Sequence, residues 1–149
     1  MIRVQVRRVV ARPIEVVFNR LAAIDDYGQW LPPSAIFRDT RLVHPDDPVL
    51  TGTEFYDFSN FGRLWGEVTD YAPPRRIAFR QRLTLRGFVA FESFPSYSLT
   101  SDDDHTHVDH VGHARFFGMY RMLEPIGRLM ARRERRRVVD ALQESLEQV

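Results

Sequence analysis

Seven segments of the chain have hydrophobic patterns that predict β-strands. The clearest is residues 76–86, where apolar and polar side chains alternate with a period of two. Its one interruption is Gln81 on the apolar face, and its other face carries several arginines. Prolines, glycines and aspartates separate this strand from its neighbours. The seven predicted strands are residues 2–10, 35–43, 53–60, 63–71, 76–86, 88–100 and 106–117.

Two short helices are predicted directly after the first strand. Pro13 suits the first turn of a helix, and apolar residues follow it at the spacing of one helical face. Those residues are Ile14, Val17, Phe18 and Leu21. Residues 25–30 then predict a second short helical turn, which has to stop before the proline pair at positions 32 and 33.

The last segment, residues 118–149, predicts a long helix with two different apolar faces. Its first half carries one stripe, formed by Met119, Leu123, Ile126 and Met130. Continued at the same spacing, that stripe reaches Arg133 and Arg137, whereas the apolar residues of the second half lie about a third of a turn away. These are Val138, Leu142, Leu146 and Val149. The halves are therefore expected to face different surroundings, with the helix proper starting near Pro125 after a short turn at 118–123.

These elements predict an α+β fold in which a curved antiparallel sheet of about seven strands wraps around one long C-terminal helix. At 149 residues the chain fits a single domain, 1–149. One terminal helix covers so long a sheet only if the sheet curves around it. This arrangement leaves space between the sheet and the helix.

Composition removes several classes of function. The chain has no cysteine and no lysine, which excludes disulfides, thiolate metal sites, a cysteine nucleophile and Schiff-base chemistry. A net charge of +1 does not indicate nucleic-acid binding. The absence of a long apolar run or a basic-then-apolar leader predicts a cytoplasmic protein without membrane insertion. No cofactor is predicted, and the oligomeric state is left open, a homodimer included.

Several short motifs occur in an order that extends over nearly the whole chain. They are Ala11-Arg12-Pro13 with Glu15, Val16, Val17 and Phe18; Tyr27 and Trp30 with Pro32; Gly52-Thr53; Gly66-Glu67-Val68 with Tyr71, Pro73, Pro74, Arg75, Arg76 and Ile77; Thr106-His107-Val108; and Phe117-Gly118. This order resembles the START-like (SRPBCC) superfamily of polyketide cyclases, dehydrases and lipid-transfer proteins, whose fold is called helix-grip. That superfamily includes cyclases, hydrolases, carriers, sensors and chaperone activators, so the resemblance implies a fold more than a function.

The resemblance implies an elongated apolar cavity between the sheet and the terminal helix, with its mouth near the first half of that helix. Its ligand would be a hydrophobic small molecule, such as a lipid or a polyketide-like compound. The expected ligand-binding residues are Trp30, Trp65, Gln81, Tyr97, Phe116, Met119, Leu123, Ile126 and Met130. Val138, Leu142 and Leu146 would instead pack on the sheet.

Four of the five histidines lie in residues 105–113. Strand alternation places His110 on the inward face, which makes it the best candidate for a catalytic acid or base. Asp57, Glu92 or Tyr97 would be its partner in a cyclisation or dehydration. The alternative is a buried histidine bonded to a neighbouring strand. The outward set, His105, His107 and Asp109, is interpreted as solvated strand residues, and no metal site is predicted.

The basic run at residues 132–137 has three interpretations. It is a solvated stretch of helix paired with Asp140, Glu144 or Glu147; a surface for a phosphate, membrane or RNA partner; or a source of one arginine, Arg133 or Arg137, that meets a ligand carboxylate at the cavity mouth. Three functions follow from the sequence in order of preference. They are binding of a hydrophobic small molecule, a cyclase or dehydrase reaction that uses His110, and binding of a partner through the arginine-rich helix.

Overall fold

The computed structural model describes residues 1–148 and contains one seven-stranded antiparallel sheet. Its strand order is β1-β7-β6-β5-β4-β3-β2. Strands β2 to β7 pair in the order of the sequence, and β1 pairs with β7. The strands are β1 (Ile2–Val10), β2 (Asp39–Leu42), β3 (Glu54–Ser59), β4 (Gly62–Ala72), β5 (Arg76–Leu85), β6 (Phe88–Asp102) and β7 (His105–Phe116). The helices are α1 (Ile14–Ala22), α2 (Tyr27–Trp30) and α3 (Glu124–Glu147), with 3₁₀ turns at Ile24–Asp26 and Gly118–Leu123. The predicted fold class is confirmed.

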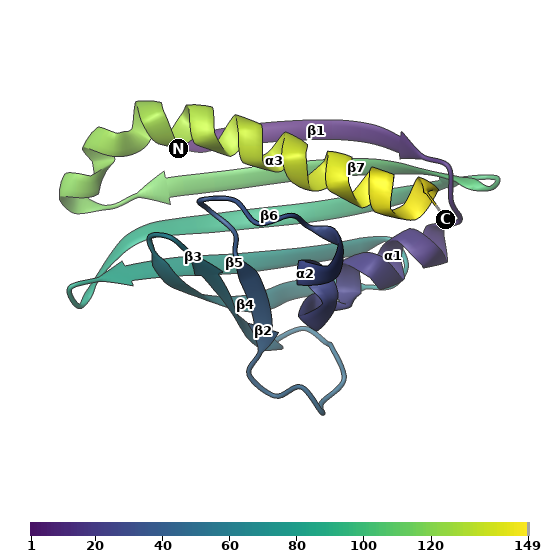
Figure 1. Cartoon of the computed structure of the whole chain (residues 1–149), viewed down its shortest axis with the longest axis horizontal. Coiled ribbons are helices and arrows are strands. Elements are labelled where there is room, and N and C mark those ends of the chain that lie inside the picture. Colours follow the sequence, from purple (N-terminus) through teal and green to yellow (C-terminus); the bar gives the residue numbers. More distant parts are fainter. Residues whose placement is uncertain (149) are drawn as a thin grey trace.

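Helix α3 runs along the β1 and β7 side of the sheet, while α1 and α2 close the end of the sheet near the C-terminus (Figure 1). The antiparallel register places Val6 of β1 and Tyr97 of β6 on either side of His110 in β7. Because this one helix is the main cover of the sheet, the inner faces of β5, β6 and β7 are turned toward α3.

The start of α3 agrees with the prediction from Pro125. A 3₁₀ turn over Gly118–Leu123 comes first, and Gly118 there has a φ of 57°, in the region that glycine tolerates best. The α-helix then begins at Glu124 with proline in its first turn. The chain thus changes direction before the helix crosses the sheet.

The second half of α3 packs in the core, as expected. Val138, Leu142 and Leu146 are buried together with the inner face of α1, and Val139 joins a smaller cluster with β1 and β7. Val149, which the sequence placed on the same face, lies outside the described residues.

The predicted strand at 35–43 is wrong in its extent, because only Asp39–Leu42 forms a strand. The Ser34 hydroxyl oxygen accepts hydrogen bonds from the backbone N–H groups of Ile36 (3.2 Å) and Phe37 (3.1 Å). Such local side-chain bonds compete with strand pairing. Residues 31–38 therefore form an irregular loop that lies between α2 and β2.

Candidate functional site

A cavity of about 450 Å³ lies between the inner face of the sheet and the first half of α3. This volume falls within the range of small-molecule pockets. The 3₁₀ turn contributes Leu123, α3 contributes Ile126 and Met130, and the opposite wall includes Leu83 and Phe91 of the sheet. The lining is mainly apolar, so the space suits a ligand with a hydrophobic body.

Five of the nine expected ligand-binding residues line this cavity. They are Gln81, Phe116, Leu123, Ile126 and Met130. Met119 does not line it, and its side chain is 76% exposed. The sequence extended the helical stripe back through Met119, but residues 118–123 form a 3₁₀ turn with a different periodicity.

Trp65 and Trp30 also lie away from this cavity. The Trp65 indole N–H donates to Glu54 (2.8 Å), and the guanidinium groups of Arg80 and Arg82 lie 5.5 and 5.7 Å from its ring centroid. It therefore belongs to the polar outer face of the sheet. Trp30 is buried in the main core against Tyr27, with a ring-centroid distance of 5.1 Å. The direction of the Trp65 side chain depends on strand register, and that of Trp30 depends on the orientation of a short helix. An error of one residue is enough to reverse the predicted direction.

A smaller chamber of about 70 Å³, whose lining includes the polar side chains of Asp57, Gln81 and Arg135, continues from the inner end of the cavity. The two spaces share Ile36, Leu64, Gln81, Glu134 and Arg135 as lining residues. Tyr97, the ninth expected ligand-binding residue, lines this chamber rather than the larger cavity. A ligand lying in the cavity would therefore direct one end toward a polar pocket.

Asp57 of β3 is the central acidic group of the chamber. Its carboxylate accepts hydrogen bonds from the Thr40 hydroxyl (2.5 Å) and from the Gln81 side-chain amide. Burial raises the pKa of Asp57 to about 6, although the Thr40 hydrogen bond and the positive charge of Arg135 act in the opposite direction. A carboxyl group with this pKa changes charge near neutral pH, which suits proton transfer.

His110 is fully buried on the inward face, as strand alternation predicted, but it lines neither space. Its ring stacks on Tyr97 with a centroid distance of 4.2 Å, and its Nδ1–H donates to the Ser96 carbonyl oxygen (2.8 Å). Burial, together with the positive charge of Arg135, lowers the pKa of His110 to about 3. Its Nε2 is then an unprotonated acceptor, and it has no hydrogen-bond partner among the described residues.

Of the three partners considered for His110, Glu92 points to the opposite side of the sheet. Its carboxylate accepts from Arg115 (2.9 Å) and Arg82 (3.1 Å). Burial alone would raise the pKa of Glu92, but these hydrogen bonds outweigh it and hold the pKa below its ordinary value. Glu92 is thus part of a structural ion-pair network.

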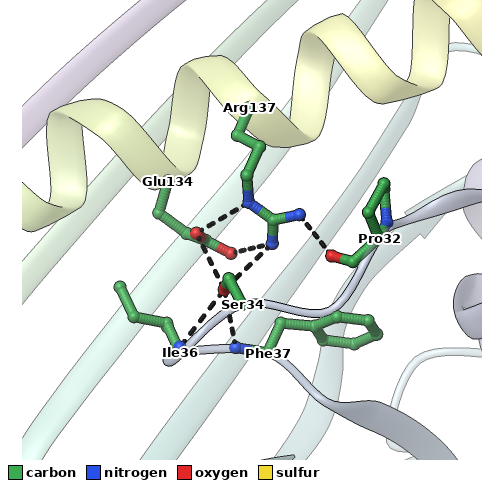
Figure 2. A network of polar contacts seen from close by, with 6 residues as sticks. All are labelled: Pro32, Ser34, Ile36, Phe37, Glu134 and Arg137. Atoms are coloured by element: carbon green, nitrogen blue, oxygen red, sulfur yellow. Dashed lines mark hydrogen bonds and ion pairs between the residues drawn. The ribbon is translucent and has the colours of Figure 1, made fainter.

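The arginine run does not pair with Asp140, Glu144 or Glu147. Figure 2 shows instead that Arg137 binds Glu134, with bonds of 2.6 and 3.1 Å, and also donates to Ser34 and to the Pro32 carbonyl. The Ser34 hydroxyl also donates to the Glu134 carboxylate (3.4 Å). This network, the Glu134–Arg137 clasp, fixes the 31–38 loop to α3.

The arginine that reaches the cavity is Arg135, not Arg133 or Arg137. It lines both the cavity and the chamber, whereas Arg133 is exposed. Helical spacing could have identified Arg135. It lies three residues before Val138 and seven before Leu142, which places it on the face of the helix that is turned toward the core. Gly112 of β7 makes room for it, since a Cβ added there would lie 3.0 Å from Arg135 Cδ.

The outward histidines form separate contacts. His107 lies 3.2 Å from Asp102, and Asp109 accepts a hydrogen bond from Gln5 (2.8 Å). Within residues 1–148 there is no group of three or more His, Cys, Asp or Glu side chains arranged to hold a metal ion. None of the described helices is both long and apolar enough to span a bilayer.

Three solved structures illustrate the similarity of this fold to known proteins. A Mesorhizobium loti protein aligns with a TM-score of 0.73 at 18% identity, covering 99% of this chain and 98% of that chain. A START superfamily protein of Mycobacterium smegmatis gives 0.71 at 15% identity, with coverages of 98% and 97%. The di-domain ARO/CYC StfQ from the steffimycin biosynthetic pathway gives 0.68 at 18% identity, and the match covers 97% of this chain and 44% of StfQ. At these identities the likeness shows the fold alone.

Comparison of the sequence itself gives the family. No curated protein matches the chain. The family described as polyketide cyclase / dehydrase and lipid transport matches residues 1–147, almost the full length. The chain therefore belongs to the polyketide cyclase / dehydrase and lipid transport family.

Proposed function

We propose that the protein binds a hydrophobic small molecule in the cavity between the sheet and the first half of α3. The observation that carries this proposal is the cavity of about 450 Å³ with its mainly apolar lining. The exposed apolar side chains of Ile126 (61%) and Leu123 (45%) at its rim fit the entry of an apolar ligand. Membership of a family that includes lipid transport supports the same reading.

The test is to fill the cavity without disturbing the core. Met130→Trp places an indole in the cavity, whereas Leu129→Trp on the 56% exposed side of the same helix is the matched control. We expect N-phenyl-1-naphthylamine to gain fluorescence on binding the native protein, with about tenfold weaker binding by the Met130→Trp variant and nearly unchanged binding by Leu129→Trp. Absence of binding to the native protein, or equal affinities in all three proteins, would contradict the proposal.

A second candidate is a cyclase or dehydrase reaction, favoured by Asp57 in the chamber that continues from the cavity. A carboxylate with a pKa of about 6 is suited to remove a proton beside a ligand carbonyl. This proposal moves the base from His110 to Asp57, because a histidine with a pKa of about 3 remains neutral and accepts protons weakly.

Proton exchange tests this second candidate without knowledge of the substrate. In deuterium oxide, the native protein should accelerate exchange of the methyl protons of 2-acetylnaphthalene, as followed by NMR. Asp57→Asn should abolish the acceleration while leaving binding of the ketone within about twofold, because the substitution keeps the side-chain shape. An equal exchange rate in the two proteins would rule out this role for Asp57.

A further inference from the structure

The polar chamber at the inner end of the cavity has an unequal supply of hydrogen-bond donors and acceptors. Its two carboxylates are already engaged by donors from the protein. Asp57 accepts from Thr40 and Gln81, and Glu134 accepts from Arg137 in the Glu134–Arg137 clasp. The acceptor side of the chamber is therefore largely occupied before any ligand enters.

The donor side contains groups without partners. Among residues 1–148, Arg135 makes no side-chain hydrogen bond and no ion pair, although a guanidinium group offers five N–H donors. The hydroxyl of Tyr97 also has no described partner. Burial raises the pKa of Tyr97 to about 12, so this hydroxyl keeps its proton and remains a donor. Both unused groups line the chamber.

Arg135 is the cation that lines the chamber, where its charge also acts on Asp57, but among residues 1–148 it forms no ion pair with Asp57 or with Glu134. Glu134 is compensated by Arg137 at 2.6 Å, which leaves Arg135 without a salt-bridge partner among the described residues. The stem of Arg135 packs over Gly112, and the residue as a whole is half-buried. A planar guanidinium in this setting suits a carboxylate, which it binds with two parallel hydrogen bonds.

We propose that Arg135 binds the carboxylate of a ligand whose apolar body fills the cavity, with the Tyr97 hydroxyl as a second donor to the same group. This inference rests on the proposed function, since it names the chemical class of the molecule bound there. The hydrocarbon part lies against Met130 and Phe116, and the acid end reaches Arg135 in the chamber, about one and a half helical turns farther along α3. The ligand class is a monocarboxylic acid with an extended apolar body.

The test compares an acid with its own ester. Displacement of N-phenyl-1-naphthylamine at pH 8 is measured for dodecanoate and for methyl dodecanoate, which share one chain and differ in the charge of one end. The native protein is expected to bind dodecanoate at least about tenfold more tightly than the ester. Arg135→Met should remove this preference while changing the ester affinity by no more than about twofold.

Two further variants separate contact from general charge. Arg136→Met removes the same charge from an exposed neighbour on the same helix and should retain the preference for the acid. Arg135→Lys keeps the charge but loses the planar fork, and we expect it to retain only part of the preference. Thermal unfolding of each variant verifies that the fold is intact before the affinities are compared.

The outcomes distinguish this inference from the proposed function. If the native protein binds acid and ester equally, or if the preference survives Arg135→Met, the carboxylate site is wrong while ligand binding stands. If neither compound displaces the probe and the probe itself does not bind, both proposals fail. A preference lost equally in Arg135→Met and Arg136→Met would show long-range attraction and overturn the assignment to Arg135.

Discussion

The two halves of α3 have the same secondary structure and different surroundings. In the second half, Leu142 is fully buried and packs with α1 and the sheet. In the first half, Leu129 is 56% exposed and Ile126 is 61% exposed, and the helix there stands over the cavity. Burial of apolar area therefore stabilises one half of the helix. In the other half, Ile126 is available to a ligand at the rim of the cavity, whereas Leu129 does not line the cavity.

One helix therefore has two roles along its length: its second half stabilises the fold, and its first half lines the binding cavity. The two halves of α3 meet at Glu134 and Arg135. There the Glu134–Arg137 clasp fixes the 31–38 loop, and Arg135 enters the chamber. Substitutions before this point should therefore affect mainly ligand binding, and substitutions after it should affect mainly the free energy of unfolding.

The largest expected effect comes from paired leucine truncations. Leu142→Ala removes a fully buried side chain and should lower the free energy of unfolding by about 2–5 kcal/mol. Leu129→Ala makes the same chemical change at an exposed position and should alter it by less than about 0.5 kcal/mol. Urea denaturation measures both, and similar losses at the two positions would remove the distinction between the halves.

The next largest loss of stability should come from removing a buried ion pair of α3 rather than an exposed one. Glu134 is 5% exposed, so Glu134→Ala leaves Arg137 without its partner and should cost about 1–3 kcal/mol, with faster hydrogen exchange in the 31–38 loop. Glu124 pairs with Arg128 at the exposed start of the helix, and Glu124→Ala should cost no more than about 1 kcal/mol. A loop whose exchange is unchanged by Glu134→Ala would show that the clasp does not hold it.

The last effect is a gain in stability at the chamber, similar in size to the loss expected for Glu134→Ala. Burial raises the pKa of Asp57 from 3.8 to about 6, so the folded protein binds this proton more tightly than the unfolded chain. Stability from this group therefore falls as the pH rises from about 4 to 6, and the ionised carboxylate remains unfavourable above that range. Asp57→Asn should raise the free energy of unfolding by about 1–3 kcal/mol at pH 8 and by little below pH 4.

The control for this gain is Asp46→Asn, the same substitution in an exposed loop. Thermal unfolding at pH 4 and pH 8 measures both variants. A loss of stability in Asp57→Asn at pH 8 would indicate that the attraction of Arg135 and the hydrogen bonds from Thr40 and Gln81 outweigh the burial of the carboxylate.

Most of the fold could be predicted from the pattern of hydrophobic positions. Six of the seven strands, the helix face containing Phe18 and Leu21, and the start of α3 near Pro125 all agree with the structure. The strand at 35–43 is shorter than predicted because the Ser34 hydroxyl accepts hydrogen bonds from two backbone N–H groups, those of Ile36 and Phe37.

Less of the site could be predicted, because facing directions depend on strand register and on helix rotation. Gln81 and Met130 line the cavity as expected, whereas Trp65 lies on the outer face of the sheet and Met119 lies on the exposed turn. The sequence indicates Asp57 only as one possible partner of His110. Its raised pKa follows from burial, which the sequence does not specify.

Periodicity is a local property of the chain, so it is enough to predict the order of the elements and the change of apolar face within α3. Which arginine enters the chamber depends instead on long-range packing. Packing of Val138 and Leu142 in the core fixes the rotation of the helix, and this rotation directs Arg135 inward over Gly112. Rotation of a helix about its axis is set by its packing partners, which lie far away in the sequence.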